Sequence, residues 1–363
     1  MKILLLGEYS NVHNTLAQGL RELGHQVTLA SNGDFWKNYP RDIDLARKPG
    51  KLGGLRLLSK VYAQLPRWTG YDVVQLINPM FLELKAERIR PIYHFLRRHN
   101  RKMVLCAYGM DYYWVNQCIT TKPLRYSDFN FGDQLRTDQE ATKEINDWIG
   151  TPKGELNKWI ANDCDGIVTG LYEYQACYAP LFPQKTRFIP FPIVPETPIV
   201  SITPTTTITI FIGISKGRNV YKGTDIMLRA AEDLQKKYPD RLRIKKAEGI
   251  PFHEYQQLMD TSDVILDQLY SYTPAMNALM AMSKGIVVIG GGEPENYAIL
   301  GEDELRPIIN VKPTYESVIQ ELEQLTLHPE RIPDLKRQSI EYIHRHHDYI
   351  KVARQYQDFY QQL

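Results

Sequence analysis

Short apolar runs alternate with helix-like segments along most of this chain, and that alternation restricts its fold more than any other feature. In the first half, runs with the length of buried strands lie at residues 3–6, 27–30, 72–77, 103–107 and 164–170. The segment after the first run carries apolar residues at helical spacing and ends at Gly24, which suits a left-handed helix cap. Strands that are separated by helices pair in parallel, so the pattern predicts a doubly wound α/β sheet.

The second half repeats this pattern after a stretch that is rich in proline. Its strand-like runs lie at residues 208–212, 242–245, 264–269, 286–289 and 308–311, and a helix-like segment follows each one. The stretch at residues 188–207 contains five prolines and is typical of a linker. We therefore predict two Rossmann-like domains, at residues 1–188 and 189–345, that face a cleft, and a final amphipathic helix at residues 346–363.

Composition excludes several classes of protein. The length of 363 residues suits about two domains, and 43% hydrophobic residues are enough for their cores. A formal net charge of +2 gives no indication of nucleic-acid binding. Four cysteines without metal-ligand spacing indicate reduced thiols. The first apolar run is too short for a signal peptide, and no segment approaches the roughly 18 apolar residues of a membrane span, so we expect a soluble, cytoplasmic protein.

An anion site is predicted where the strand at residues 208–212 ends. Its loop combines glycines and cations before a helix that begins near Thr224, and its members are Gly213, Ser215, Lys216, Gly217, Arg218, Lys222 and Gly223. Unpaired N–H groups and the dipole at a helix N-terminus favour anions, and Lys or Arg adds full charge. The pattern predicts a diphosphate site with Lys222 as its main cation, and an exposed basic turn is the alternative.

Polar side chains also follow strands of the first half. The first loop lacks the G-x-G-x-x-G of dinucleotide-binding folds, which argues against a nicotinamide enzyme. His13 lies in the first turn of the next helix, where the dipole favours a neutral imidazole that can bind a substrate hydroxyl. A surface histidine is the alternative. Asp111 follows the strand at residues 103–107 and either accepts hydrogen bonds from sugar hydroxyls or caps a helix whose aromatic residues enter the core.

Acidic residues and glycines end two strands of the second half. Asp267 lies at the end of the run at residues 264–269. After the following strand, Gly291 and Gly292 belong to a triple glycine that lets a ligand approach the backbone closely. Glu293 and Glu295 flank the proline of a helix start, where they either contact a ligand or only complement the helix dipole.

Together, these motifs resemble the two-domain GT-B glycosyltransferases, and in particular the retaining, family-4-like enzymes that use sugar nucleotides. The matches lie at residues 2–6, 13 and 24–27, at residues 108–111 for an H-G-x-D element, at Lys222-Gly223 with Arg218 for the phosphate-binding pair, and at residues 281–295 for the block that ends in G-G-x-P-E. The similarity covers almost the whole chain in order. It implies that the first domain binds the acceptor, that the second binds the donor, and that the final helix packs back onto the first domain.

The chain departs from this family at residues that handle the donor sugar. The family's two glutamates, eight positions apart, fall on Tyr272 and Met280, which have no carboxylate. The family's histidine of H-G-x-D is Tyr108, and the arginine before the K-G lysine falls on Gly217. Replacement contacts to sugar hydroxyls are therefore expected from Asp267, Asn277, Glu293 or Glu295, and the second cation from Arg218 or Lys216.

The resemblance implies a hexosyltransferase that moves a sugar from a nucleotide diphosphate to an acceptor hydroxyl with retention, in polysaccharide or glycolipid assembly. Lys222, with Arg218 or Lys216, would stabilise the departing diphosphate without a metal ion, and no cofactor is expected. Two other functions fit the sequence. One is a catalytically inactive, sugar-nucleotide-binding partner subunit of an active transferase, and the other is a sugar-nucleotide epimerase.

Basic stretches in the first half bear on the acceptor, which is expected to be a saccharide or a lipid-linked sugar. Arginines and lysines gather at residues 88–102, and again at residues 47–60 around Leu55, Leu57 and Leu58. Such stretches either meet anionic lipid headgroups at a membrane surface or form a solvated basic face. Peripheral contact with an anionic membrane is one interpretation of these residues, and no nucleic-acid partner is expected.

Overall fold

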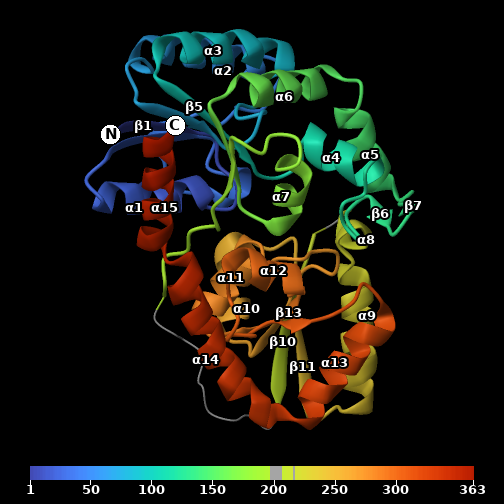
Figure 1. The fold of residues 1–363 in the computed structure, drawn as a ribbon. Coiled ribbons are helices and arrows are strands. Elements are labelled where there is room, and N and C mark those ends of the chain that lie inside the picture. Colours follow the sequence, from blue (N-terminus) through green and yellow to red (C-terminus); the bar gives the residue numbers. More distant parts are fainter. Residues whose placement is uncertain (197–206, 216) are drawn as a thin grey trace. The chain divides into compact units, whose positions relative to one another are not determined.

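The computed structural model describes residues 1–196, 207–215 and 217–363 (Figure 1). The chain divides into two compact units, each described here by itself. Unit 1 comprises Met1–Pro123, Lys143–Pro192 and Tyr349–Leu363, and unit 2 comprises Leu124–Thr142 and Ile193–Asp348. The expected divisions near residues 188 and 345 lie close to two of these boundaries. The sequence pattern does not predict that residues 124–142 belong to unit 2.

Unit 1 is built on a seven-stranded parallel sheet with the order β3-β2-β1-β4-β5-β8-β9. Its strands are β1 (Lys2–Leu6), β2 (Gln26–Ser31), β3 (Ile43–Asp44), β4 (Val73–Leu76), β5 (Lys102–Ala107), β8 (Gly166–Thr169) and β9 (Thr186–Phe188). Its helices are α1 (Val12–Glu22), α2 (Gly53–Gln64), α3 (Ala86–His99), α4 (Tyr112–Ile119), most of α5 (Gln139–Trp148), α6 (Pro152–Asp163), α7 (Tyr172–Tyr178) and α15 (Tyr349–Gln362).

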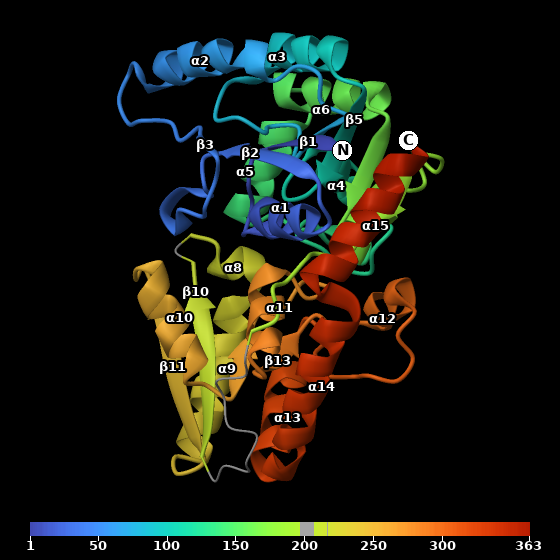
Figure 2. The same cartoon turned by 90° about the vertical axis from the view of Figure 1, so that its left-hand side faces the viewer.

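The final helix of the chain packs on the first one. At Gly19, an added Cβ would lie 2.5 Å from the carbonyl oxygen of Tyr349 and 2.8 Å from Cβ of Ala353. Only glycine lets α1 and α15 approach this closely (Figure 2). The C-terminal helix therefore packs in unit 1 against a helix from the opposite end of the sequence.

Unit 2 contains a five-stranded parallel sheet with the order β11-β10-β12-β13-β14. Its strands are β10 (Ile208–Ile214), β11 (Leu242–Glu248), β12 (Val264–Leu266), β13 (Val287–Gly290) and β14 (Ile309–Asn310). Its helices are α8 (Asn219–Lys222), α9 (Thr224–Lys237), α10 (Phe252–Asp260), α11 (Met276–Ser283), α12 (Pro294–Leu300), α13 (Tyr315–Leu327) and α14 (Ile332–Tyr342). A small antiparallel hairpin of β6 (Asn130–Phe131) and β7 (Gln134–Leu135) completes the unit.

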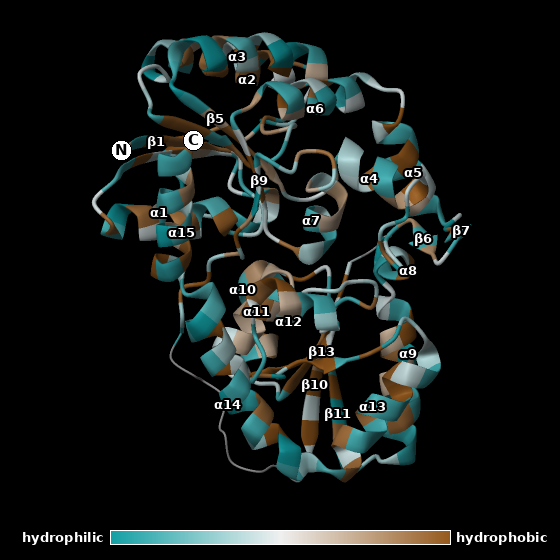
Figure 3. Cartoon of the chain, in the orientation of Figure 1, coloured by the Kyte–Doolittle hydropathy of each residue, from teal (hydrophilic) through white to brown (hydrophobic). Residues whose placement is uncertain are grey.

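Both sheets are covered on two faces, which explains why the strands appear in the sequence as continuous apolar runs. Strands such as β5 and β13 are largely brown in Figure 3, whereas most outward-facing helix surfaces are teal. In β1, the side chains of residues 3–6 have no exposed surface. The two parallel, doubly wound sheets that the sequence predicts are confirmed.

Three local features differ from the sequence interpretation or lie beyond it. Helix α3 begins at Ala86 and contains Pro91 in its interior. Two prolines of the predicted linker, Pro198 and Pro204, lie outside the described residues. Among the helices of the described ranges, none combines the length and apolar character that crossing a membrane requires.

Candidate functional site

The sheet of unit 2 has a topological switch point at β10. From β10 the chain goes to β11 on one side and then crosses to β12 on the other side of β10, so the strand order reverses there. In open α/β sheets, ligands bind outside the carboxyl ends of strands at such a point. The loops after β10 and β12 are therefore the place to examine first.

The turn that carries Lys222 is pressed against the end of β12. Helix α8 ends at Lys222, and Gly223 adopts a left-handed conformation with φ of 71° before α9 begins at Thr224. The carbonyl oxygen of Lys222 accepts a hydrogen bond from the N–H of Leu269 at 3.0 Å. A Cβ on Gly223 would lie 2.6 Å from Cβ of Leu269, so only glycine fits at this position.

A polar cluster stands beside this turn. Asp267, with 7% of its surface exposed, accepts a hydrogen bond from the Asn277 amide at 3.4 Å. The Tyr255 hydroxyl donates to the Asn277 carbonyl oxygen at 3.0 Å. Burial raises the pKa of Asp267, while the positive charge of Lys222 and the Asn277 hydrogen bond oppose that rise. The structure thus brings Lys222, Asp267 and Asn277 into one electrostatic neighbourhood.

Gly213 contributes to the same cluster through its lack of a side chain. It lies within β10, and a Cβ there would stand 2.7 Å from the Tyr255 hydroxyl oxygen. Glycine at this position therefore leaves room for the tyrosine that orients Asn277.

The other described cation of the predicted loop, Arg218, contacts a different residue. The Arg218 guanidinium lies 5.4 Å from the centre of the Tyr221 ring, and the residue is exposed. Ser215 accepts the N–H of Arg218 through its carbonyl oxygen at 3.0 Å. Gly217 has φ of 76° with open space around it, and Lys216 lies outside the described residues. Lys222 is therefore the cation of this loop that the structure links to Asp267.

The triple-glycine loop after β13 is also tightly packed. A Cβ on Gly291 would lie 2.3 Å from the Ser271 hydroxyl oxygen, and that oxygen is buried without a hydrogen-bond partner among the described residues. The N–H of Gly292 donates to Asn310 at 3.1 Å. Glycine at position 291 is therefore required by its packing against Ser271, and close approach of a ligand to this backbone stays a prediction.

Glu293 and Glu295 are both engaged by a residue that the sequence analysis does not single out. Arg125 forms an ion pair with Glu293 at 2.8 Å and a second one with Glu295, whose pKa it lowers. The Tyr126 hydroxyl donates to Glu293 at 2.7 Å. As the structure stands, these carboxylates bind Arg125 and Tyr126 rather than presenting free oxygens to a sugar.

An aromatic pair occupies the position that corresponds to the first family glutamate. Tyr272 has 1% of its surface exposed and stacks on Tyr126 with ring centres 4.7 Å apart. Its hydroxyl accepts the N–H of Tyr126 at 3.2 Å, and the Arg125 guanidinium lies 5.0 Å from its ring centre. The local sequence around residue 125 does not predict the contacts of Arg125 and Tyr126. The segment lacks apolar periodicity, and its partners lie far along the chain.

In unit 1, His13 is a buried link in a hydrogen-bond chain. Its Nδ1 lies 2.9 Å from the Gly7 carbonyl oxygen, which can only accept, so we assign the ring proton to Nδ1. Its Nε2 then accepts from the Gln75 amide at 3.1 Å, and Gln75 accepts from the Tyr360 hydroxyl at 2.6 Å. Burial lowers the pKa of His13 to about 3, so the ring is neutral. The alternative of a surface histidine is wrong, and both ring nitrogens already have partners.

This burial predicts a pH-dependent contribution of His13 to stability. Below pH 6.5, the ordinary pKa of histidine, His13 is protonated in the unfolded chain but stays neutral in the folded protein. The free energy of unfolding therefore falls as the pH drops from 6.5 towards 3. Replacing His13 by Asn removes this term. Between pH 7 and pH 4, the wild type should lose about 3 kcal/mol of unfolding free energy relative to His13→Asn, as measured by urea unfolding. A difference between the two proteins that does not change with pH would contradict this assignment.

Asp111 caps helix α4. Its carboxylate accepts the N–H of Trp114 at 2.8 Å and the Tyr178 hydroxyl at 2.7 Å, and the residue has no exposed surface. Burial raises the pKa of Asp111 to about 6. Tyr113 and Trp114 are buried, as the helix-cap alternative predicts. A role of Asp111 towards sugar hydroxyls remains a prediction.

Three of the basic residues in and after α3 form ion pairs. Arg97 bridges Asp163 and Asp165 at 3.4 and 2.6 Å. Arg101 and Lys102 face Asp72 and Asp165 at 3.2 and 3.8 Å, respectively. These pairs favour the interpretation of a solvated basic face for this part of unit 1.

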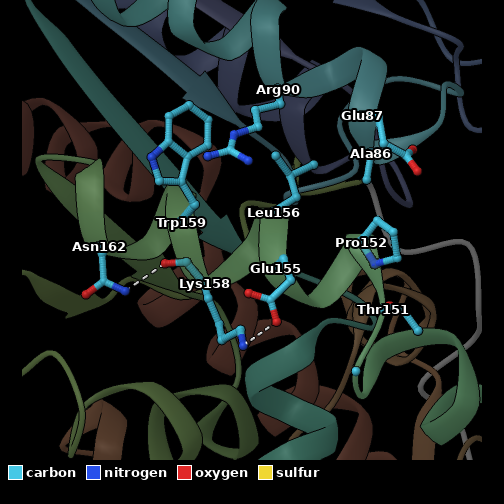
Figure 4. Close-up of a pocket in the computed structure, with 11 residues that line it drawn as sticks. Ala86, Glu87, Arg90, Thr151, Pro152, Glu155, Leu156, Lys158, Trp159 and Asn162 are labelled. Carbon is cyan, nitrogen blue, oxygen red and sulfur yellow. Dashed lines mark hydrogen bonds and ion pairs between the residues drawn. The ribbon is translucent and has the colours of Figure 1, made fainter.

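A hollow of about 710 Å³ lies in unit 1 between α3 and α6 (Figure 4). Two of its charged groups pair with each other, since Lys158 lies 2.6 Å from Glu155, and the Arg90 guanidinium lies 5.0 Å from the Trp159 ring centre. Among the described residues, no group of three or more His, Cys, Asp or Glu side chains is arranged to hold a metal ion. The groups that suit a sugar nucleotide lie together in unit 2. They are the Lys222 cation, the buried Asp267 carboxylate, the Asn277 amide and the start of α9.

Comparison with known proteins supports the fold. No protein-family model matches the sequence, and no curated protein is similar to it in sequence. Among solved structures, HepE of Anabaena in complex with UDP and glucose is similar, with a TM-score of 0.61, 11% identity and full coverage of both chains. Sucrose-phosphate synthase from Thermosynechococcus elongatus has a TM-score of 0.61 and 13% identity, with coverage of 100% of this chain and 99% of that one.

A structure from another functional class is also similar. UDP-GlcNAc 2-epimerase from Neisseria meningitidis, bound to UDP-GlcNAc, has a TM-score of 0.55 and 11% identity over all of both chains. Identities this low show fold only, and fold alone does not fix function. The two parallel sheets and the whole-length structural similarity show that the chain has the GT-B type of fold.

Proposed function

We propose that this protein is a glycosyltransferase that moves a sugar from a nucleotide diphosphate to an acceptor hydroxyl. The observation that carries this proposal is the turn at Lys222 and Gly223, which joins a cation to the start of α9 at the switch point of unit 2. Asp267 and Asn277 stand beside it as hydrogen-bonding groups for sugar or ribose hydroxyls. Similar folds solved with UDP and glucose support a sugar nucleotide as the ligand.

The chemistry assigned to this site is charge stabilisation. The bond between the anomeric carbon and the β-phosphate oxygen breaks, and the acceptor oxygen forms the new bond to that carbon. Negative charge gathers on the departing diphosphate, where the Lys222 ammonium and the first N–H groups of α9 stabilise it. The leaving phosphate takes the proton of the acceptor hydroxyl. This route requires neither a metal ion nor a cofactor, and attack on the leaving-group face gives retention.

A nucleotide panel tests the proposal. Calorimetry with UDP, ADP and GDP, and with their sugar derivatives, identifies the donor, and release of the free nucleotide in the presence of saccharide acceptors reports transfer. Tight binding with release supports the transferase. Failure of every nucleoside diphosphate to bind would refute it.

The same panel separates the two other functions. A change in sugar configuration without nucleotide release indicates an epimerase. The structural similarity to a UDP-GlcNAc 2-epimerase is the reason to include this function in the test. Binding without turnover with any acceptor indicates a partner subunit, which the loss of carboxylates at Tyr272 and Met280 favours.

We further propose that the acceptor is a saccharide or a lipid-linked sugar used in polysaccharide or glycolipid assembly, reached from the cytoplasm at a membrane surface. Leu52 and Leu55, at the start of α2, are 57% and 61% exposed and lie among exposed Lys51 and Arg56. Apolar side chains framed by cations suit an anionic bilayer surface.

A double substitution of these leucines tests the membrane contact. Leu52→Glu with Leu55→Glu should lower co-sedimentation with liposomes rich in phosphatidylserine at least about fivefold, because buried apolar area is lost and like charge is added. Leu327→Glu, at a leucine 40% exposed in unit 2, is the matched control and should change co-sedimentation little. Equal co-sedimentation of both variants and the wild type would remove α2 from the proposal.

A further inference from the structure

Residues Leu124–Thr142, which we call the arm, belong to unit 2 although the chain on both sides of them belongs to unit 1. The arm contains the β6–β7 hairpin, which lies beside α8 in Figure 1. Its side chains reach both ligand loops of unit 2. Arg125 contacts the loop of Glu293 and Glu295, and Arg136 contacts α8 just before Lys222.

Arg136 is a buried side chain of the arm with several hydrogen-bond partners. It has 8% of its surface exposed, and its guanidinium donates to the carbonyl oxygens of Val220 and Tyr221, at 3.1 Å each. Its Nε donates to Asp138 at 3.0 Å, and the ring centre of Tyr270 lies 4.4 Å from the guanidinium carbon. A planar fork of this kind fixes two acceptors at once, which a lysine does not do.

The two carbonyls that Arg136 binds determine where Lys222 stands. Helix α8 has four residues, and a helix this short does not hold its shape by its own hydrogen bonds. Val220 and Tyr221 immediately precede Lys222, and the carbonyl oxygen of Lys222 is held by Leu269 of the β12 loop. The turn is thus fixed at two points, one of them supplied by the arm.

We propose that Arg136 is a positioning residue for the diphosphate site. It holds α8 so that the Lys222 side chain and the first N–H groups of α9 can bind the same phosphate. The inference rests on the proposed function, because it assigns Arg136 to the site where that function places the diphosphate. It adds that a segment outside the sequence motifs of the second half builds the site.

The test compares nucleotide affinities of full-length variants by calorimetry. The probe is whichever of UDP, ADP or GDP binds the wild type, together with its monophosphate. Arg136→Met keeps an unbranched, flexible side chain and removes the guanidinium with its hydrogen bonds. It should weaken diphosphate binding at least about tenfold and monophosphate binding less than about threefold, because one or two charge-assisted hydrogen bonds fix the phosphate-binding turn.

Two further variants separate positioning from general destabilisation. Arg306→Met removes a guanidinium that likewise binds two carbonyls, those of Glu302 and Leu305, and covers the Tyr297 ring, so it is the matched control. It should leave both affinities unchanged. In a Lys222→Ala background, Arg136→Met should weaken diphosphate binding less than about threefold, because residues that act as a unit have non-additive effects.

The outcomes distinguish failure of this inference from failure of the proposed function. If the wild type binds no nucleoside diphosphate, the proposed function falls and the inference with it. If Lys222→Ala weakens diphosphate binding and Arg136→Met does not, or if Arg136→Met weakens the monophosphate equally, the positioning role alone is overturned. Should Arg136→Met not fold, Arg136→Lys carries the same comparison with an expected loss of about threefold, because it keeps the charge and loses the fork.

Discussion

Replacement of Lys222 by alanine is expected to lower the rate of nucleotide release from the donor at least ~100-fold, as loss of a single preorganised charge stabiliser does at other sites. Lys222 acts where the diphosphate gains charge, so the loss should appear mainly in kcat. Binding of the monophosphate should change little. The measurement is steady-state release of the nucleoside diphosphate with the donor that binds the wild type.

A lysine on the same stretch of chain provides the control. Lys236 lies in the last turn of α9, exposed and paired with Asp233 at 2.9 Å. Lys236→Ala changes the charge of the protein by the same amount, and its turnover should stay within about twofold of the wild type. Near-normal turnover of Lys222→Ala would mean that this ammonium does not stabilise the leaving group.

The second large effect is expected at Gly223. Alanine there must adopt a left-handed conformation, which costs roughly 1–2 kcal/mol, and its Cβ would lie 2.6 Å from Cβ of Leu269. The turn must move to relieve this contact, and Lys222 moves with it. We expect diphosphate affinity to fall at least about tenfold and the melting temperature of unit 2 to fall by about 5 °C or more, in calorimetric titration and scanning calorimetry.

Gly301→Ala isolates the backbone component of that effect. Gly301 has φ of 65°, close to that of Gly223, but an added Cβ meets nothing within 4 Å. It lies at the C-terminal end of α12 and should lose stability without losing diphosphate affinity. Equal affinity of Gly223→Ala and the wild type would show that the turn does not need its present geometry to bind the ligand.

Much of the fold follows from sequence pattern because buried parallel strands are continuous apolar runs. The runs at residues 208–212 and 286–289 overlap β10 and β13 almost completely. Glycine, lysine and a helix start at Gly223 likewise mark the predicted anion-binding turn locally in the sequence. The order of the strands in each sheet cannot be predicted in this way. It depends on which apolar runs pair in space, and the sequence of one run does not indicate which strand lies beside it in the sheet.

The contacts of the arm also cannot be predicted from the sequence pattern, because they join residues that are far apart in the chain. Arg125 pairs with Glu293 across 168 positions and Arg136 reaches Tyr221 across 85. Polar side chains that act at such separations leave no periodic signal. His13 is a different case. Its place near a helix start can be predicted from the sequence, but its burial cannot, because β4 and the C-terminal helix α15 supply the groups packed around it.

Consequently, the sequence identifies the candidate cation but not its surroundings. Lys222 and Asp267 are singled out by their positions after strands, and Asn277 as a replacement contact for the missing glutamates. The structure adds that the three lie together. Glu293 and Glu295 are singled out in the same way, yet their contact with Arg125 appears only in three dimensions.

The most direct test of the central claim is a crystal structure of the full chain with the nucleoside diphosphate that binds it. The account predicts a phosphate within about 3 Å of the Lys222 ammonium nitrogen and of N–H groups in the first turn of α9. A diphosphate bound at any other place in unit 2, with Lys222 making no contact to it, would contradict the account.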